Sequence, residues 1–490
     1  MLKSLIVGAA LVILPSLAVA QDARTVIGTV SSAMGADGLK TIVFSATGED
    51  FAMGQAYNPT SPWPRFINKS YTRMIDFDAP SSRVDRVRNQ AENPPHGGGQ
   101  QPVRGDQAAN QTIIINSSTP WVQQLEIWMT PYGFLKAART NNATVTSQTI
   151  GGKKYQVLTF VGQNKSTVNA YVNAQNMIEK IDTHIDNAML GDMLFEALYS
   201  EYKDVGGVKF PMKIVQKQGG YRIFDLAVND VKPNAPVSIQ APQGRGGAGG
   251  AGGAGRAGGA GGGEASATPS EKLADGVYLI LGGYASIAVD FKDYIVVIEG
   301  PQSEERASAI IAEAKRLIPG KPIKYLVNTH HHFDHASGLR TFVAEGATII
   351  TNQINKSYYE KLFAAPHTLG PDKLAMSKKT PTIETMTEKR VLTDGNHVVE
   401  LHHVRGSGHN AGLLVAYFPK EKILVEADSY NPPAQASAPV PMPISPFTSN
   451  LMENLDRLKL KVETIIPIHY AADGRKITWA ELQRAAGRAN

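Results

Sequence analysis

The chain has 490 residues, of which 42% are apolar and 19% are charged, and its formal net charge is +5. This length exceeds the size at which one hydrophobic core normally stops growing, so two folded domains are expected. The excess of positive charge is small and is spread along the chain, which argues against nucleic acid as a partner. The chain has no cysteine, which excludes disulfides and thiolate metal ligands.

The N-terminus, "MLKSLIVGAALVILPSLAVAQ", has the features of a signal peptide over residues 1–20. One lysine precedes an apolar run, and a small-x-small pattern ends at Ala20, before Gln21. The alternative, a membrane anchor, is disfavoured because the run is short for a bilayer and contains Pro15. The sequence therefore predicts a periplasmic or secreted protein with no transmembrane anchor.

Residues 21–242 are predicted to form an antiparallel β-rich domain. Short β-branched or alternating runs such as "KTIVFSATG", "QTIIINS" and "QVLTFVG" recur through this part of the chain. We expect one or two helices between the strands, for example from Leu190 to Tyr202. A Pro-, Gly-, Gln- and Asn-rich stretch from Val87 to Thr112 predicts a long loop, in which His96 stands alone and is not expected to bind metal.

Two segments near the end of this domain suggest its relatives. "YKDVGGVKFPMKIVQKQGG" and "FDLAVNDVKPNAPV" resemble the periplasmic lipoprotein-carrier-like domains, in which a curved antiparallel sheet wraps an apolar cavity. The resemblance covers about the last third of the domain. It implies a scaffold or an apolar-ligand binder, and it supplies no catalytic residue.

Residues 243–270 are Gly- and Ala-rich and predict a flexible linker, because almost none of their side chains can pack. The linker separates the first domain from a second domain at residues 271–490. Ten of the twelve histidines follow the linker. Histidines that were merely scattered over the surface would not be expected to show this uneven distribution.

The second domain begins with the strand-like runs "GVYLILGG", "SIAVDF" and "YIVVIEGP". The next segment, "SEERASAIIAEAKRLIPG", predicts a helix with acidic residues in its first turn and Lys315 and Arg316 in its last. The run "IKYLVNT" then predicts a buried strand. This order places "HHHFDH" directly after the carboxyl end of a strand, where α/β sheets build their sites.

The stretch from His330 to His335 has the pattern H-x-H-x-D-H. In an extended loop, residues two apart project to the same side, so His330 and His332 can bind one ion while Asp334 and His335 turn toward a second. A tetrahedral ion needs more than two protein ligands. Further polar residues at the ends of apolar runs can supply them: His409, Asp428 and His469.

These motifs, in this order, resemble the metallo-β-lactamase superfamily over nearly all of residues 271–490. The resemblance implies a C-terminal αβ/βα four-layer sandwich, and hence an α+β chain in which an antiparallel, curved-sheet domain comes first. The metal ligands that it implies are His330, His332 and His409 for a first site, and Asp334, His335 and His469 for a second site.

Two positions depart from the usual pattern of the superfamily. Glu299 stands where the family usually has a strand-end aspartate, and we expect it to keep the role of bracing the loop. Asp428 would bridge both sites, as in the hydrolase branches. However, the cysteine-free β-lactamases have a similar Ala-Asp-Ser in which the aspartate does not bridge, so bridging by Asp428 stays open.

Nitrogen and oxygen ligands with histidine predominating favour zinc, with manganese and iron as alternatives. Two ions about 3.5–4 Å apart would lower the pKa of a shared water toward about 7 and generate hydroxide, with Asp334 orienting the attacking oxygen. We therefore expect hydrolysis of an ester, thioester, lactone or lactam bond in a small-molecule substrate. The alternatives are an iron-dependent thiol-sulfur oxygenase and a non-catalytic periplasmic carrier with a structural metal domain.

Other polar residues are expected to have structural roles. Tyr430 and Asn431 follow the Asp428 strand and are interpreted either as substrate contacts or as ordinary loop residues. Residues 352–385 and 429–446 form the loops that would select the substrate, but their sequences carry no recognisable chemistry. The histidines predicted to be structural, or to support the metal ligands without binding metal, are His184, His331, His367, His397, His402 and His403.

Overall fold

The computed structural model describes residues 22–92, 95–98, 105–162, 165–240, 268–440 and 442–488. The predicted signal peptide lies outside these residues, as does nearly all of the predicted linker. Within the described ranges, no helix is both long enough and apolar enough to cross a membrane.

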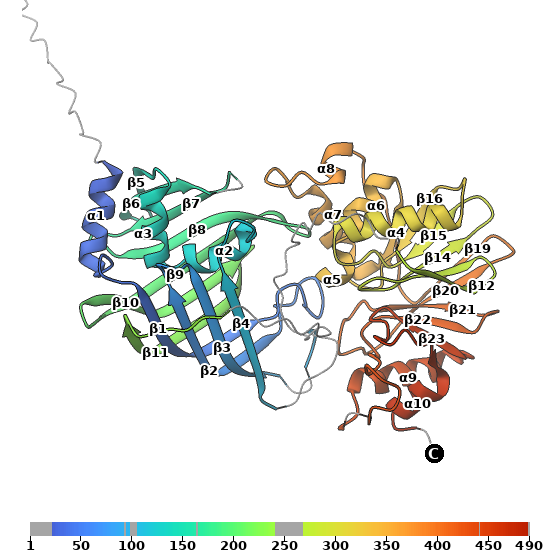
Figure 1. Cartoon of the computed structure of the whole chain (residues 1–490). Helices are drawn as coiled ribbons and strands as arrows, with labels where there is room; N and C mark the ends of the chain where they lie inside the picture. The colour runs from blue at the N-terminus through green and yellow to red at the C-terminus, as the bar shows by residue number, and fades with distance from the viewer. Residues whose placement is uncertain are drawn as a thin grey trace, which may run out of the picture.

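The N-terminal domain is built on one eleven-stranded sheet whose neighbours are all antiparallel, in the order β4-β3-β2-β1-β11-β10-β9-β8-β7-β6-β5. The sheet curves around the helices, and both contribute to one large core (Figure 1). The helices are α1 (Ala23–Met34), α2 (Trp121–Trp128) and α3 (Pro131–Thr140). The strands are β1 (Thr41–Phe51), β2 (Arg65–Asp76), β3 (Ser81–Gln90), β4 (Gln107–Ile114), β5 (Thr144–Ile150), β6 (Lys153–Val161), β7 (Thr167–Val172), β8 (Ile178–Asn187), β9 (Gly191–Val205), β10 (Val208–Gln218) and β11 (Tyr221–Pro233).

Two expectations for this domain were wrong in detail. The segment from Leu190 to Tyr202 is not a helix, because β9 occupies Gly191–Val205. Burial alternates strictly from Gly191 to Tyr199, which is the period of a strand with one face in the core. The predicted loop from Val87 to Thr112 is also shorter than expected, since β3 and β4 extend into it from both sides.

The C-terminal half contains two further sheets. The seven-stranded sheet has the order β12 (Ser270–Ala274), β13 (Val277–Ile280), β14 (Ser286–Asp290), β15 (Ile295–Ile298), β16 (Ile323–Val327), β17 (Thr348–Asn352) and β18 (Ile383–Met386). The six-stranded sheet has the order β19 (Lys389–Thr393), β20 (Val398–His403), β21 (Leu414–Phe418), β22 (Ile423–Glu426), β23 (Thr464–Pro467) and β24 (Ile477–Thr478). The helices are α4 (Glu304–Leu317), α5 (Phe333–Ala336), α6 (Leu339–Glu345), α7 (Lys356–Ala364), α8 (Lys373–Ser377), α9 (Pro446–Leu458) and α10 (Trp479–Ala485), and Gln353–Asn355 form a 3₁₀ turn, η1.

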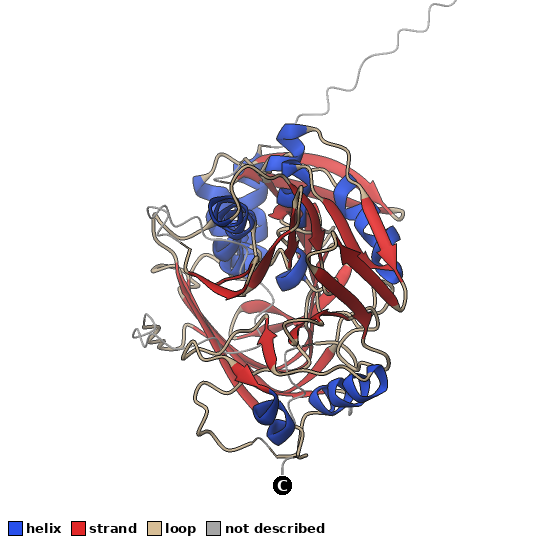
Figure 2. Cartoon of the chain, turned by 90° about the vertical axis from the view of Figure 1, so that its right-hand side faces the viewer, coloured by secondary structure: helices blue, strands red, loops and turns tan. Residues whose placement is uncertain are grey.

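Three hydrophobic cores hold these layers together. The first lies between the two sheets and includes Val296 and Val425. The second joins the seven-stranded sheet to α4 and α6, where Phe342 is fully buried. The third packs α9 and α10 against the six-stranded sheet through residues such as Leu451 and Leu482. Helices thus cover both outer faces of the paired sheets (Figure 2), and the predicted α+β chain with a four-layer C-terminal sandwich is confirmed.

The turn between β8 and β9 fixes one contact between the two domains. Met189, at this turn, is 1% exposed and belongs to the core formed by α4, α6 and α7 of the C-terminal half. The Asp192 backbone N–H donates to the Pro366 carbonyl at 2.8 Å. The Asp192 carboxylate accepts hydrogen bonds from the N–H and hydroxyl of Thr368 and from the N–H of Leu369. The domains therefore meet through both apolar packing and a set of polar contacts.

Candidate metal centre

The residues predicted as metal ligands come from loops at the ends of four strands. His330 and His332 follow β16, and Asp334 and His335 lie on the short helix α5, which faces the N-terminal domain (Figure 1). The remaining three are His409 before β21, Asp428 after β22 and His469 after β23. The structure brings all seven together.

Their ligand atoms form two groups. In each group, one nitrogen or oxygen atom from every residue lies within 4.8 Å of the others. The first group is His330, His332, His409 and Asp428, and the second is Asp334, His335 and His469. These are the two sets that the sequence predicted, with Asp428 placed in the first.

The distances between ring nitrogens suit a shared ion. In the first group, the Nε2 atoms of His330 and His409 are 3.2 Å apart. In the second, the Nε2 atoms of His335 and His469 are 3.3 Å apart. Two nitrogens bound at about 2.0–2.1 Å to one tetrahedral zinc would be separated by about 3.3 Å. The donor set and its spacing therefore fit zinc in both groups.

Asp428 lies between the two groups. One carboxylate oxygen, Oδ2, is 3.3 Å from His330 Nε2 and 3.2 Å from His409 Nε2. The same oxygen is 2.8 Å from His335 Nε2, while Oδ1 is 2.9 Å from His469 Nε2. Asp428 has a backbone φ of +60°, in the left-handed region that costs free energy for a residue with a Cβ. This strained position lets one buried carboxylate contact histidines of both groups.

Neighbouring groups orient two of the histidines. His332 Nε2 donates to the Ala56 carbonyl at 2.9 Å, which leaves the buried Nδ1 atom with its lone pair and, in the structure described, without a hydrogen-bond partner. His335 Nδ1 lies 3.5 Å from a carboxylate oxygen of Glu299, which is fully buried. Metal-binding histidines commonly have such a carbonyl or carboxylate on the nitrogen that faces away from the metal.

Burial and mutual charge shift the pKa values of these residues. Burial lowers the pKa of His330 to about 3, and the neighbouring His335 contributes in the same direction. Burial likewise lowers the pKa of His332. For His335, burial favours the neutral form, but the charges of Asp428 and Asp334 outweigh it and raise the pKa well above its usual value. Neutral His330 and His332 can donate lone pairs to a cation at neutral pH.

Asp428 and Asp334 are held as carboxylates. Burial raises the pKa of Asp428, but the charges of the surrounding histidines, led by His469, outweigh it and keep the pKa well below the usual value. The same balance, with His335 as the main counter-charge, lowers the pKa of Asp334. The centre therefore combines anionic oxygen donors with the neutral nitrogen donors of His330 and His332, which suits a divalent ion.

The prediction of an extended loop for the His330–His335 stretch was wrong for its second half. Phe333–Ala336 form a helical turn, so Asp334 and His335 point toward the second group from α5 rather than from an extended backbone. His331 fits the structural role predicted for it, since its Nδ1 is 3.0 Å from the amide nitrogen of Asn410.

Other polar residues whose role was left open also have structural partners. His402 Nε2 is 2.9 Å from a carboxylate oxygen of Glu400, and His403 Nε2 is 2.9 Å from the Ala411 carbonyl. Tyr430 is 3% exposed, and its hydroxyl is 3.3 Å from a carboxylate oxygen of Glu481. It belongs to the core between the six-stranded sheet and the helices α9 and α10.

Three residues at the centre were missed at the level of sequence. Gln55 Nε2 donates to Asp334 Oδ1 at 2.8 Å, and the Tyr284 hydroxyl donates to Asp334 Oδ2 at 2.9 Å. Ala56 supplies the carbonyl on His332. Gln55 and Ala56 belong to the other domain and carry no motif. Tyr284 follows the predicted strand "GVYLILGG" and precedes another strand. This position at a strand end was the only feature of the sequence that could have marked Tyr284 as a site residue.

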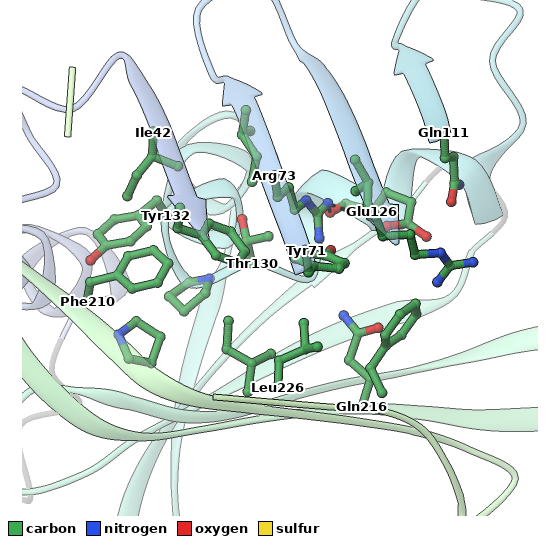
Figure 3. A pocket seen from close by; sticks show the side chains of 18 of the residues that line it. Ile42, Tyr71, Arg73, Gln111, Glu126, Thr130, Tyr132, Phe210, Gln216 and Leu226 are labelled. Atoms are coloured by element: carbon green, nitrogen blue, oxygen red, sulfur yellow. Dashed lines mark hydrogen bonds and ion pairs between the residues drawn. The ribbon is translucent and has the colours of Figure 1, made fainter. Parts of the chain in front are cut away.

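A second candidate site is a cavity of about 220 Å³ in the N-terminal domain (Figure 3). Its wall is mainly aromatic and aliphatic and includes Phe44, Tyr71 and Leu226. Arg73 also lines the cavity. Its guanidinium binds the carbonyl and the carboxylate of Glu126, so the carboxylate partly neutralises the positive charge of Arg73. The cavity therefore favours an apolar or amphiphilic occupant.

Comparison with known proteins gives the family of the C-terminal half. Residues 298–469 match the family model described as "Metallo-beta-lactamase superfamily". A curated relative, the metallo-beta-lactamase type 2 of Elizabethkingia meningoseptica, is 28% identical over 164 residues. That match covers 32% of this chain and 59% of the relative, which is less than two thirds of the relative's length.

Solved structures also align with this half of the chain. A metallo-beta-lactamase from Pontibacter korlensis is 18% identical with a TM-score of 0.34, and the alignment covers 45% of this chain and 98% of that one. The rubredoxin oxygen:oxidoreductase of Desulfovibrio gigas is 19% identical with a TM-score of 0.34, and the alignment covers 45% and 61% of the two chains. On the family match, residues 298–469 of this chain form a domain of the metallo-beta-lactamase superfamily.

Proposed function

We propose that this protein is an exported, metal-dependent hydrolase that holds two zinc ions and cleaves an ester, thioester, lactone or lactam bond in a small molecule. The observation that carries the proposal is the pair of ligand groups with Asp428 between them, in a domain of this superfamily. Structural zinc sites are usually closed and mononuclear, whereas two adjacent ions are typical of hydrolytic centres. Export rests on the predicted signal peptide at residues 1–20.

The chain supplies the ligands, and the ions would supply the activated water. Zinc, when bound, acts as a Lewis acid and lowers the pKa of a bound water toward about 7. His330, His332 and His409 would hold one ion, and Asp334, His335 and His469 the other, with Asp428 shared. Gln55 and Tyr284 hold both oxygens of Asp334, which would orient the attacking water and accept its hydrogen bond.

Elemental analysis of the purified protein tests this proposal. We expect two zinc ions per chain, and we expect removal of zinc by a chelator to abolish hydrolysis of ester, thioester, lactone and lactam substrates until zinc is restored. His332→Ala should lower the metal content, because it removes a ligand of the first group. His184→Ala, which changes an exposed histidine on β8, is the matched control and should keep both ions.

The same measurement separates the alternatives. One iron per chain, with sulfur-oxygenating activity on a thiol substrate, would replace the hydrolase by the oxygenase. Zinc with no catalytic activity across the substrate panel would support a carrier with a structural metal domain. A protein that binds no metal would contradict all three assignments of the centre.

For the N-terminal domain we propose a second function, the binding of an apolar small molecule in the cavity between the sheet and the helices. The aromatic and aliphatic lining supports this proposal, and the resemblance to lipoprotein-carrier-like domains is consistent with it. A neutral naphthylamine dye should bind with enhanced fluorescence. Val84→Trp should weaken binding at least about tenfold because the larger ring takes up part of the cavity volume. Val161→Trp, at a position 56% exposed, should not; equal binding by both variants would contradict the site.

A further inference from the structure

The loop between β1 and β2, residues 52–64, reaches from the N-terminal domain to the metal centre (Figure 1). Four consecutive residues of this β1–β2 loop each make one hydrogen bond to the C-terminal half. Two of these bonds join backbone groups: Phe333 N–H donates to the Gly54 carbonyl at 3.2 Å, and Ala411 N–H donates to the Tyr57 carbonyl at 2.9 Å. The other two involve side chains of the predicted ligands His332 and Asp334.

The bond to His332 determines which ring nitrogen can bind metal. The Ala56 carbonyl can only accept, so Nε2 of the neutral ring must carry the proton, and Nδ1 keeps its lone pair. Both residues are buried, Ala56 at 6% and His332 at 0% exposure. Without this carbonyl, the His332 ring would lose the contact that fixes its tautomer.

The bond to Asp334 acts on the second group. Gln55 donates to Oδ1, while Tyr284 of the C-terminal half donates to Oδ2. The two donors hold the carboxylate from both sides and set its orientation toward His335 and His469. One of these two donors is contributed by the N-terminal domain.

Tight packing keeps the β1–β2 loop in this position. Gly54 has a φ of +74°, and a Cβ at this position would lie 2.3 Å from the Phe333 ring. Trp63, which is 7% exposed, packs edge-on against the same ring, with 6.4 Å between centroids. The segment at 95–98 adds a backbone bond from Gly97 N–H to the Gly408 carbonyl, next to His409. The contact is therefore an ordered interface that includes the loops of the metal centre.

We propose that the N-terminal domain completes the metal centre, with Ala56 and Gln55 as positioning residues for His332 and Asp334. This inference rests on the proposed function, because it requires the two groups to bind metal. It assigns the β1–β2 loop to the active site of a domain that lies more than 200 residues later in the chain. Partners that orient a metal ligand in this way typically change metal affinity by about 10–100-fold.

Zinc affinity measured by chelator competition tests the inference without relying on activity. Gln55→Ala removes the donor to Asp334 and leaves the loop backbone unchanged, so we expect about 10–100-fold weaker binding of one ion and unchanged binding of the other. Gln148→Ala on the exposed strand β5 is the matched control and should bind both ions as the wild type does.

A second variant tests the contact to His332. Gly54→Ala places a methyl group against the Phe333 ring and should displace the loop carbonyls, which lowers affinity for the ion of the first group by about 10–100-fold. Gly152→Ala is its control, because Gly152 also has a positive φ, of +80°, but has no atom within 4 Å of the added group. Circular dichroism of the metal-free proteins checks that each variant is folded.

The outcomes separate this inference from the proposed function. If the wild type binds zinc and Gln55→Ala binds both ions equally well, the inference is wrong and the metal centre stands on the C-terminal residues alone. If the wild type binds no zinc, the proposed function itself fails. If Gly54→Ala does not fold, Gln55→Ala still decides the question.

Discussion

Asp428→Ala is expected to leave the protein with less than one zinc ion per chain and to reduce hydrolysis by more than about 100-fold. The reason is geometric: its two carboxylate oxygens lie within 3.3 Å of ring nitrogens from both ligand groups. Removing them would leave the buried imidazoles without the carboxylate between the two groups, and two bound ions would lose the ligand that they are proposed to share. Elemental analysis and zinc titration of the variant measure the effect.

Asp456→Ala provides the control for this prediction. Asp456 is 59% exposed in its side chain and pairs with Arg488 on the surface, so its loss should change neither metal content nor activity. Retention of two ions by Asp428→Ala would show that Asp428 does not bridge. The Ala-Asp-Ser of this chain would then behave as in the cysteine-free β-lactamases, with Asp428 as a neighbour of the ligands.

The largest expected loss of stability is for Phe342→Ala, at about 3–5 kcal/mol in the free energy of unfolding of the C-terminal domain. Phe342 on α6 is fully buried between α4 and the seven-stranded sheet, and a Cβ at Gly300 would lie 3.0 Å from its ring. The substitution leaves a cavity in the core that Phe342 shares with Ala336 and Leu339. Urea unfolding of the metal-free protein measures the change.

Two further variants calibrate that measurement. Phe342→Leu keeps most of the volume and should cost less than about 1.5 kcal/mol. Val391→Ala, at a position 47% exposed on β19, should stay within about 0.5 kcal/mol of the wild type. A loss below about 1 kcal/mol for Phe342→Ala would contradict the tight packing described for this layer.

The sequence was informative about the C-terminal half because its signals are local. A polar residue after a buried apolar run marks the end of a strand, which singles out Asp428 and His469, and His409 stands out in a Gly-rich turn before the strand β21. The helix α4 was also predicted, because acidic residues in its first turn and Lys315 and Arg316 in its last turn follow the helix dipole. Whether the seven residues bind metal stays a prediction.

The sequence-based predictions failed in two places: where a segment predicted as a helix is a strand, and where residues far apart in the chain come into contact. The segment from Leu190 to Tyr202 was predicted as a helix, but pairing with β8 and β10 on both sides makes it a strand. The roles of Gln55 and Ala56 could not be predicted, because neither residue type is a usual site signal and their partners lie in the other domain. Long-range docking leaves no local pattern.

The contact between the β1–β2 loop and the metal centre also has a consequence for the order of folding. The bond from Gln55 to Asp334 spans 279 positions of the chain, and that from His332 to Ala56 spans 276. Domains generally fold as units, with the N-terminal one first, and docking of domains takes milliseconds to minutes. On the proposal that the β1–β2 loop completes the metal centre, we expect the centre to form last, when the two folded domains dock.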